Sequence, residues 1–470
     1  MTIDNLYTDN STICAISTPH GTGGIAVIRI SGPEAISITS QCWQGADISK
    51  MQSHTTHLGN ILFADGEILD QVVLNIFRAP NSFTGEDVIE LSCHGSVWIQ
   101  QQIVNRLIEV GCRAATAGEF TQRAFANHRI DLSQAEAIAD VIASASRASH
   151  RIAINQMRGA FSSQLAQLRE QLLEFVSLIE LELDFSEEDV EFADRTKLKT
   201  LASKILNVIT RLADSFATGD VIKNGLPVAI AGETNAGKST LLNYLLHDDR
   251  ALVSDIHGTT RDVIEDTITL GGTSFRFIDT AGIRQTDDTI EAMGIQRTFK
   301  KIDEARLVLW IIDGTTATQH IPQLCQEILP HTTGKKLIAA VNKDDLLTPE
   351  QRKQISQMLS AELPADAQQI FISARQHTAL NKLQDMLIQI AIQPEADGNQ
   401  VIVTNARHYE ALIHAKEALT RAIQALNDGI SGDFVSQDIR ECMHYLGEIT
   451  GEITTHEILG TIFSRFCVGK

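Results

Sequence analysis

The chain has 470 residues, 43% of them hydrophobic, and this length predicts two to four domains with cores of their own. Its 39 Lys and Arg residues against 59 Asp and Glu residues leave a net charge of −20, which argues against a protein that coats nucleic acid or anionic membrane. No apolar run approaches the roughly 18 residues of a membrane span, and the polar first ten residues do not resemble a signal peptide. Seven scattered cysteines without Cys-x-x-Cys spacing argue against a zinc knuckle or a disulfide scaffold. We therefore expect a cytoplasmic, multidomain protein with no membrane association.

Short β-rich runs alternate with turn signals in the first part of the chain. Residues 25–30 lie between glycine-containing turns, and residues 87–91 lie between Gly85 and Gly95. A helical pattern over residues 97–110 follows the second run. Strands and a helix in one segment predict an α+β domain.

Two other patterns follow along the chain. From about residue 133 to 183, apolar side chains recur at i, i+3 and i+4, which predicts long amphipathic helices. After Gly225-Leu-Pro227, short apolar runs alternate with helical segments, as is typical of a parallel sheet wrapped by helices. The strands predicted for that sheet are residues 228–231, 275–278, 307–312, 337–341 and 370–372. Helical periodicity returns after about residue 389.

These changes of pattern predict a multidomain α/β protein in which an α/β domain is inserted into a helical domain. The predicted parts are an N-terminal α+β domain (1–127), the first part of the helical domain (128–222), the inserted domain (223–388) and the second part of the helical domain (389–470).

The strongest chemical motif is Gly232-Glu-Thr-Asn-Ala-Gly-Lys-Ser239, a full match to the phosphate-binding loop pattern G-x4-G-K-S. A predicted strand precedes the motif and an apolar helix follows it. The glycines let backbone N–H groups curl around a phosphate, and the helix N-terminus adds the positive end of its dipole. Lys238 can reach the β- and γ-phosphates, and the Ser239 hydroxyl can bind Mg²⁺. The motif therefore predicts binding of a nucleoside triphosphate.

Three further motifs fall at the ends of later predicted strands, where an open α/β sheet binds its ligands. Asp279-Thr-Ala-Gly282 can hold Mg²⁺ through water and donate the Gly282 N–H to the γ-phosphate. Asn342-Lys343-Asp344-Asp345 matches the guanine-recognition motif N-K-x-D, in which a carboxylate accepts from two donors that adenine lacks. Ser373-Ala374-Arg375 can offer a backbone N–H to the guanine oxygen. In this order, the motifs predict GTP rather than ATP.

Residues 254–262 follow the phosphate-binding loop at the place where a switch loop is expected. A threonine there can complete the Mg²⁺ shell only when the γ-phosphate is present. Ile283 stands where many GTPases carry a glutamine that orients the attacking water, and an isoleucine cannot take that role. Glu291, Asp287 and Asp288 are candidates for the water-orienting group, and the chemistry alone does not choose among them.

With the C-terminal Phe466-Cys-Val-Gly-Lys470, these motifs resemble the tRNA modification GTPase family MnmE, also called TrmE. The resemblance covers the whole chain and includes Ile28-Arg-Ile-Ser-Gly32, Asn81-Ser-Phe-Thr-Gly-Glu-Asp87, Gly118-Glu-Phe120, Arg123-Ala-Phe125, Gln134-Ala-Glu-Ala-Ile-Ala-Asp140 and Gly447-Glu-Ile-Thr-Gly451. It implies an N-terminal α+β tetrahydrofolate-binding and dimerisation domain, an all-α helical domain, and a P-loop GTPase domain of the Ras-like α/β type inserted into the helical domain.

The resemblance also implies an activity. The protein would be a K⁺-activated GTPase that forms homodimers and joins a partner, MnmG, in a heterotetrameric or larger complex in which the partner carries FAD. The complex would add a carboxymethylaminomethyl or aminomethyl group at carbon five of the wobble uridine (position 34) of certain tRNAs. The one-carbon donor would be 5-formyl- or 5,10-methylene-tetrahydrofolate. A ribosome-assembly or stress-response switch is the alternative, and the KH-type Gly-x-x-Gly loop that would favour it is not found after the GTPase motifs.

Finally, the resemblance implies roles for single residues. Glu291 would orient the attacking water. The residues that would hold K⁺ are Asn235, Ser254, Ile256 and Thr259, and those that would hold Mg²⁺ are Ser239 and Thr260. The residues that would bind the reduced folate are Arg29, Glu90, Arg129 and Lys470. The full set of expected GTP contacts is Asn235, Ala236, Gly237, Lys238, Ser239, Thr240, Ser254, Asp255, Ile256, His257, Gly258, Thr259, Thr260, Asp279, Thr280, Ala281, Gly282, Asn342, Lys343, Asp345, Ser373, Ala374 and Arg375.

Overall fold

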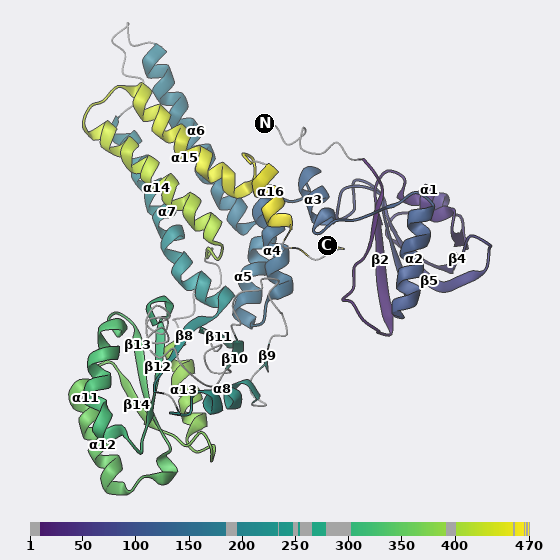
Figure 1. Cartoon of the computed structure of the whole chain (residues 1–470). Coiled ribbons are helices and arrows are strands. Elements are labelled where there is room, and N and C mark those ends of the chain that lie inside the picture. Colours follow the sequence, from purple (N-terminus) through teal and green to yellow (C-terminus); the bar gives the residue numbers. More distant parts are fainter. Residues whose placement is uncertain are drawn as a thin grey trace. The chain divides into compact units, whose positions relative to one another are not determined.

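The structure, a computed structural model, divides the chain into two compact units (Figure 1). It describes residues 10–184, 195–233, 235–247, 252–253, 266–278, 302–391, 401–454, 456–464, 466 and 469. Unit 1 takes residues 1–139, 154–210 and 410–470, and unit 2 takes residues 140–153 and 211–409.

A sheet of seven strands forms the N-terminal part of unit 1. Its strands are β1 Ile13–Ile16, β2 Ile25–Ser31, β3 Trp43–Gln44, β4 Thr55–Leu62, β5 Ile68–Phe77, β6 Val88–His94 and β7 Arg113–Ala114, and its helices are α1 Ala35–Ser40, α2 Val97–Glu109 and α3 Glu119–Ala126. The strand order is β3-β4-β5-β6-β2-β1-β7, and only the β1–β7 pair is parallel. Helices α1 and α2 cover one face, where they share a core with Ala26, Ile28 and Ile30 of β2. Because side chains alternate along a strand, Val27 and Arg29 lie on the opposite face.

The predictions for this segment are confirmed. The two predicted strands correspond to β2 and β6, and the predicted helix corresponds to α2.

Long helices follow, as the apolar spacing predicts. They are α4 Leu132–Ala143, α5 Arg147–Met157, α6 Ala160–Asp184, α7 Arg195–Asn224, α14 Ala406–Asn427, α15 Gly432–Thr450 and α16 His456–Phe463. Helices α6 and α15 of unit 1 run side by side (Figure 1), and an ion pair joins Arg169 of α6 to Glu452 just beyond α15. In the same unit, Phe463 at the end of α16 packs against Phe125 of α3 and Leu132 of α4. Segments far apart in sequence therefore share one core.

A second seven-stranded sheet forms the centre of unit 2. Its strands are β8 Leu226–Ala231, β9 Leu252–Val253, β10 Asp266–Leu270, β11 Thr273–Ile278, β12 Leu307–Asp313, β13 Lys336–Asn342 and β14 Gln368–Phe371, and its helices are α8 Lys238–His247, α11 Ala317–Ile328, α12 Pro349–Glu362 and α13 Leu380–Ala391. The order is β14-β13-β12-β8-β11-β10-β9, parallel except at β10, which is antiparallel to both neighbours. The five predicted strands correspond to β8, β11, β12, β13 and β14. The last of these ends at Phe371, one residue before the predicted end.

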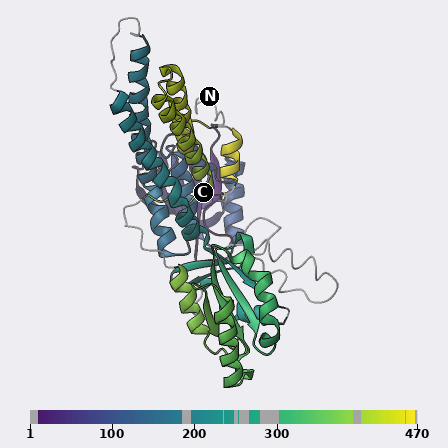
Figure 2. The same cartoon turned by 90° about the vertical axis from the view of Figure 1, so that its left-hand side faces the viewer.

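Helices cover both faces of this sheet (Figure 2). Leu309 of β12 joins a core with α8 and α13, whereas its neighbour Trp310 joins a core with α11 and α12. All seven residues of β12 are buried, because a parallel strand covered on both sides needs apolar residues at successive positions. The result is the doubly wound α/β arrangement that the sequence predicts.

Two findings concern membrane spans and disulfide bonds. None of the helices in the described ranges is both long and apolar enough to cross a membrane. The six cysteines that the structure describes are buried and free.

Candidate nucleotide site and N-terminal site

The phosphate-binding loop connects β8 to α8 in unit 2. The two glycines of the motif, Gly232 and Gly237, have backbone φ values of +143° and +97°. Residues that carry a side chain rarely adopt such values. A Cβ atom at Gly232 would come within 2.2 Å of the Ile311 carbonyl oxygen, and one at Gly237 within 2.1 Å of Asn342 Nδ2. Both positions therefore require glycine for the backbone conformation and for the space.

Lys238 is the first residue of α8, and its side chain folds back over the loop. Its ammonium donates to the carbonyl oxygens of Gly232 at 2.5 Å and Glu233 at 2.9 Å. Burial lowers the pKa of Lys238, and the nearby Glu233 carboxylate acts in the opposite direction. That carboxylate itself lies 2.9 Å from Nδ1 of His320. The loop therefore holds the lysine at the helix N-terminus, where a phosphate would meet both the ammonium and the backbone N–H groups.

Asn342, the last residue of β13, joins two loops of unit 2. Its Nδ2 donates to the Ala236 carbonyl oxygen at 2.8 Å, and its Oδ1 accepts from the Ala374 N–H at 2.9 Å. The residue is only 3% exposed. One buried amide thus connects the phosphate-binding loop to the loop after β14, and it uses both ends of its side chain to do so.

The residues after Asn342 turn sharply at Lys343, whose φ is +67°. The Lys343 ammonium lies 2.5 Å from Oδ2 of Asp313, the last residue of β12. Although burial raises the pKa of Asp313, the hydrogen bond from Lys343 and those from Thr315 outweigh it, and the net pKa is lowered. Asp345 remains exposed, with Gln376 Nε2 3.4 Å from its Oδ2. A carboxylate at this exposed position suits recognition of N–H donors on a ligand.

The other expected GTP contacts fall into two groups. Asn235, Ala236, Ser239 and Thr240 lie in the phosphate-binding loop and the first turn of α8, and Ser373, Ala374 and Arg375 lie in the loop after β14. The remaining ones, residues 254–260 and 279–282, lie outside the described residues, as do Glu291, Asp287 and Asp288. Within the described ranges no group of three or more His, Cys, Asp or Glu side chains could hold a metal.

In unit 1, three of the residues expected to bind folate lie in the described part. Arg29 of β2 and Glu90 of β6 are cross-strand partners. Nε of Arg29 donates to Oε1 of Glu90 at 2.9 Å, and Nη2 lies 2.8 Å from the same oxygen in an ion pair. The guanidinium of Arg29 also lies 5.5 Å from the ring centroid of Phe83 and 5.6 Å from that of Phe120. The structure therefore brings Arg29 and Glu90 together in a half-buried ion pair.

Arg129 and the end of the chain each contact a segment that adjoins the N-terminal sheet. A Cβ atom at Gly85 would lie 3.3 Å from Cγ of Arg129, which places Arg129 against the 81–87 loop that carries Phe83. Near the C-terminus, the Gly469 carbonyl oxygen accepts from Oγ of Ser17 at 3.0 Å. Ser17 directly follows β1, and its N–H donates to Val27 of β2. Lys470 itself lies outside the described residues.

Sequence reasoning missed the residues that fix the 81–87 loop. Glu86 accepts from Arg123 Nη1 at 3.0 Å and from Ser31 Oγ at 2.7 Å, and Ser31 Oγ is also 2.7 Å from Thr84 Oγ1. Asn127 Nδ2 donates to the Thr84 carbonyl oxygen. These residues stand in or beside motifs that carry the family resemblance, so the motifs were visible but the contacts between them were not.

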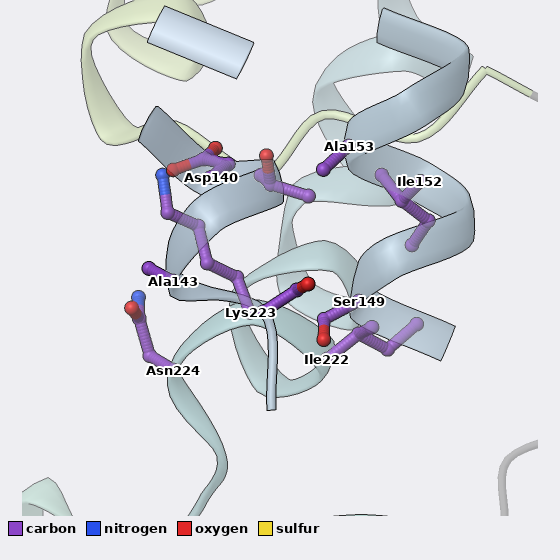
Figure 3. A pocket seen from close by; sticks show the side chains of 10 residues that line it. Asp140, Ala143, Ser149, Ile152, Ala153, Ile222, Lys223 and Asn224 are labelled. Carbon is purple, nitrogen blue, oxygen red and sulfur yellow. The ribbon is translucent and has the colours of Figure 1, made fainter. Parts of the chain in front are cut away.

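A separate small cavity lies among helical segments of unit 2 (Figure 3). It has a volume of about 110 Å³, and Nζ of Lys223 points across it to Oδ2 of Asp140 at 2.8 Å. Ser149 and Asn224 add polar groups to its wall. Pockets for small organic ligands are usually about 300 Å³ or more, so this cavity is too small for a nucleotide or a folate. Sequence reasoning gave no role to its residues.

Comparisons with known proteins identify the same family as the sequence motifs do. Residues 12–129 match the GTP-binding protein TrmE N-terminus, and residues 132–467 match the MnmE helical domain. A protein of Bacteroides thetaiotaomicron named tRNA modification GTPase MnmE is 55% identical over 466 residues, which cover 98% of this chain and 100% of that one. One of the same name from Flavobacterium johnsoniae is 49% identical over 469 residues, with the same two coverages. The chain belongs to the MnmE (TrmE) family of tRNA modification GTPases.

Proposed function

We propose that this chain hydrolyses GTP and that the hydrolysis serves the modification of tRNA, as the names of its relatives say of them. The observation that carries the proposal is the bridge through Asn342, which holds the phosphate-binding loop at Ala236 and the loop at Ala374 together. A loop of phosphate-binding type and a candidate guanine contact thereby meet at one edge of the sheet, where nucleotides bind in this class of fold.

The described residues suggest how GTP would be held. The N–H groups of the loop and the Lys238 ammonium would bind the phosphates, and the Asp345 carboxylate would accept from the guanine N–H groups. Because the Ala374 N–H already donates to Asn342, another backbone N–H of the 373–375 loop would face the guanine oxygen. Mg²⁺ in nucleotide sites takes one or two protein ligands besides phosphate and water, and the Ser239 hydroxyl at the start of α8 suits one of them. Thr260 would be the other.

Potassium would act on the same phosphates. The expected ligands are Asn235, Ser254, Ile256 and Thr259, of which the structure describes Asn235, in a left-handed turn of the loop with φ of +66°. When bound, K⁺ would supply positive charge to the transition state, as an arginine finger does in other GTPases. Glu291 would orient the attacking water.

The N-terminal site would bind the one-carbon donor, a 5-formyl- or 5,10-methylene-tetrahydrofolate. Nε and Nη2 of Arg29 both lie against Oε1 of Glu90, which leaves Oε2 to accept from the N–H groups of a pterin. Arg129 and Lys470 would bind the carboxylates of the glutamyl tail. With a partner of the MnmG type that carries FAD, the homodimeric protein would modify carbon five of the wobble uridine of certain tRNAs in the cytoplasm.

The assignment of parts belongs to the same proposal. Residues 1–127 would be the folate-binding and dimerisation domain, residues 223–388 the GTPase domain, and residues 128–222 and 389–470 the helical domain that surrounds its insertion point.

The first test is GTP hydrolysis by the purified protein in KCl and in NaCl at equal ionic strength, with Glu291→Ala alongside. We expect a large preference for KCl, and a variant that still binds GTP but does not turn it over. Equal rates in the two salts would contradict the K⁺ site, and a fully active variant would contradict the role of Glu291.

A second test addresses the base. Asp345→Asn replaces an acceptor by a donor and should change the preference from GTP to xanthosine triphosphate, whose base carries an oxygen in place of the amino group. Asp344→Asn is a matched control, because the Asp344 carboxylate pairs with Arg352 at 3.3 Å instead. The same preference for GTP in all three proteins would show that Asp345 does not contact the base.

The reaction as a whole is tested by reconstitution with a purified FAD-carrying partner of the MnmG type, tRNA, GTP, K⁺, labelled 5,10-methylene-tetrahydrofolate, and ammonium or glycine as the amine that supplies the nitrogen of the product. We expect the label to appear in the wobble uridine. If GTP is hydrolysed and no label enters the tRNA, the proposed folate-dependent reaction is wrong although the GTPase proposal stands.

A further inference from the structure

An exposed aromatic ring stands beside the Arg29–Glu90 pair. Phe83 is 38% exposed, whereas Phe120, the other ring near the Arg29 guanidinium, is fully buried. Both phenylalanine rings therefore lie near the Arg29 guanidinium, but only that of Phe83 is exposed to solvent. Burial of an aromatic ring is favourable, so a ring that stays open next to a charged pair is a candidate for contact with a ligand.

The backbone around Phe83 is fixed on both sides. Ser82 Oγ donates to the Glu86 carbonyl oxygen at 2.6 Å, which closes a tight turn around Phe83. The next residue, Thr84, is fully buried, and its carbonyl oxygen accepts from Asn127 at 2.7 Å. Phe83 is thus held near Arg29 by anchored neighbours, and its exposure is built into the turn.

The Glu90 carboxylate is placed to bind the edge of a ligand that lies on the Phe83 ring. Glu90 faces Asn75 of β5 on one side and Arg29 on the other in the sheet register. Arg29 pairs with Oε1 only, and the Glu90 side chain is 23% exposed, so the second carboxylate oxygen can accept N–H donors from the edge of a planar ligand. A flat ring with donors along one edge would meet the carboxylate with that edge and the aromatic side chain with its face.

We propose that Phe83 is the stacking platform for the pterin ring of the reduced folate, a contact that determines affinity for the pterin and not for the glutamyl tail. The proposal rests on the proposed folate function of this site. The pyrimidine part of a reduced pterin is planar and carries amino and ring N–H donors, so it can bind Glu90 along its edge while its face lies on Phe83. The basic residues of the site serve the tail, which is flexible and carries the carboxylates.

The experiment measures dissociation constants of the full-length protein by titration calorimetry with three probes. The probes are 5-formyl-tetrahydrofolate, a tetrahydropterin without the tail, and p-aminobenzoyl-glutamate, which has the tail but no pterin. In Phe83→Leu we expect about a tenfold or larger increase in the dissociation constant for the two pterin-containing probes and no change for p-aminobenzoyl-glutamate. Phe83→Tyr keeps a ring and should remain close to the parent.

Phe434→Leu is the matched control, because Phe434 is an exposed phenylalanine on α15, outside the N-terminal sheet. It should bind all three probes as the parent does. An unchanged GTP hydrolysis rate and circular dichroism spectrum in Phe83→Leu would show that the variant is folded.

The outcomes separate the inference from the function on which it rests. If the parent does not bind 5-formyl-tetrahydrofolate, the proposed folate site is wrong. If the parent binds it and Phe83→Leu binds equally well, the stacking role is wrong. Equal loss for all three probes, or loss in Phe83→Tyr equal to that in Phe83→Leu, would also overturn the assignment, because neither effect is specific to a ring stacked on a pterin.

Discussion

Removal of the Asn342 side chain should loosen the nucleotide site and unit 2 together. Asn342→Ala deletes both buried hydrogen bonds, to Ala236 and Ala374, and leaves a carbonyl oxygen and an N–H without their partner. A typical hydrogen bond contributes about 1 kcal/mol net, and each buried group left unsatisfied costs about 1–3 kcal/mol. Partial access of water to the loops would reduce this cost, so we expect a loss of about 2–4 kcal/mol in the free energy of unfolding.

The fluorescence of Trp310 allows the unfolding free energy of unit 2 to be measured separately. Trp310 is fully buried in β12, beside β13, whereas the other two tryptophans, Trp43 and Trp98, lie in unit 1. With those two replaced by phenylalanine, fluorescence during urea unfolding reports on unit 2. For a slope of about 2 kcal/mol per molar urea, the midpoint should fall by about 1–2 M in Asn342→Ala.

The same variant should bind GDP more weakly, because the ligand must then restore the arrangement of the two loops. An unchanged midpoint together with unchanged GDP affinity would refute the reasoning. It would mean that the loops keep their positions without the amide between them.

Three further predictions concern unit 2. Gly237→Ala should abolish nucleotide binding, measured by titration with a fluorescent GDP analogue, because its Cβ would lie 2.1 Å from Asn342 Nδ2 and its φ of +97° is strained for alanine. Asp313→Asn should lower stability at pH 7 by about 1 kcal/mol, because the oxygen that accepts from Lys343 loses its negative charge. Because the pKa of Asp313 lies below its unfolded value of 3.8, this difference should be complete above about pH 4 and shrink as the pH falls below it, which urea titrations across pH would show. Thr348→Ala should lower the unfolding free energy by about 1 kcal/mol, seen as a lower melting temperature, because Thr348 forms the capping box of α12.

Much of the architecture could be predicted because its causes are local. The run 307–312 is apolar at successive positions, and the strand that it forms is buried on both faces. In β2 the alternation of Ile28 and Ile30 with Arg29 gave a strand with one covered face. The phosphate-binding loop was recognisable because two of its glycines are required by backbone geometry at fixed spacing.

The contacts inside the sites could not be predicted, because they depend on distances between segments far apart in sequence. Asn342 could be recognised as part of a guanine motif, but its bond to Ala236, 106 residues away, follows from the order of β8, β12 and β13 in the sheet. Similarly, the resemblance implied that Arg29 and Glu90 both serve the folate. That the two side chains pair with each other follows from the β2–β6 register, which the sequence does not reveal. The exposed Phe83 ring beside them likewise depends on the conformation of its turn.

Glu86 tests whether anchoring of that turn matters for the N-terminal site. Its carboxylate accepts from the buried Arg123 and from Ser31, so Glu86→Gln removes a charge from a buried pair and should cost about 1–3 kcal/mol in urea unfolding. Because the Glu86 carboxylate also ties the turn to Arg123 and Ser31, weakening these contacts should lower the affinity for 5-formyl-tetrahydrofolate although Phe83 itself is unchanged. Glu109→Gln, which breaks only an exposed pair with Arg106, should alter neither quantity appreciably. A Glu86→Gln protein that is less stable but binds the folate as tightly as the parent would show that the ring is positioned by its own packing against Arg29, and not by the polar network beneath it.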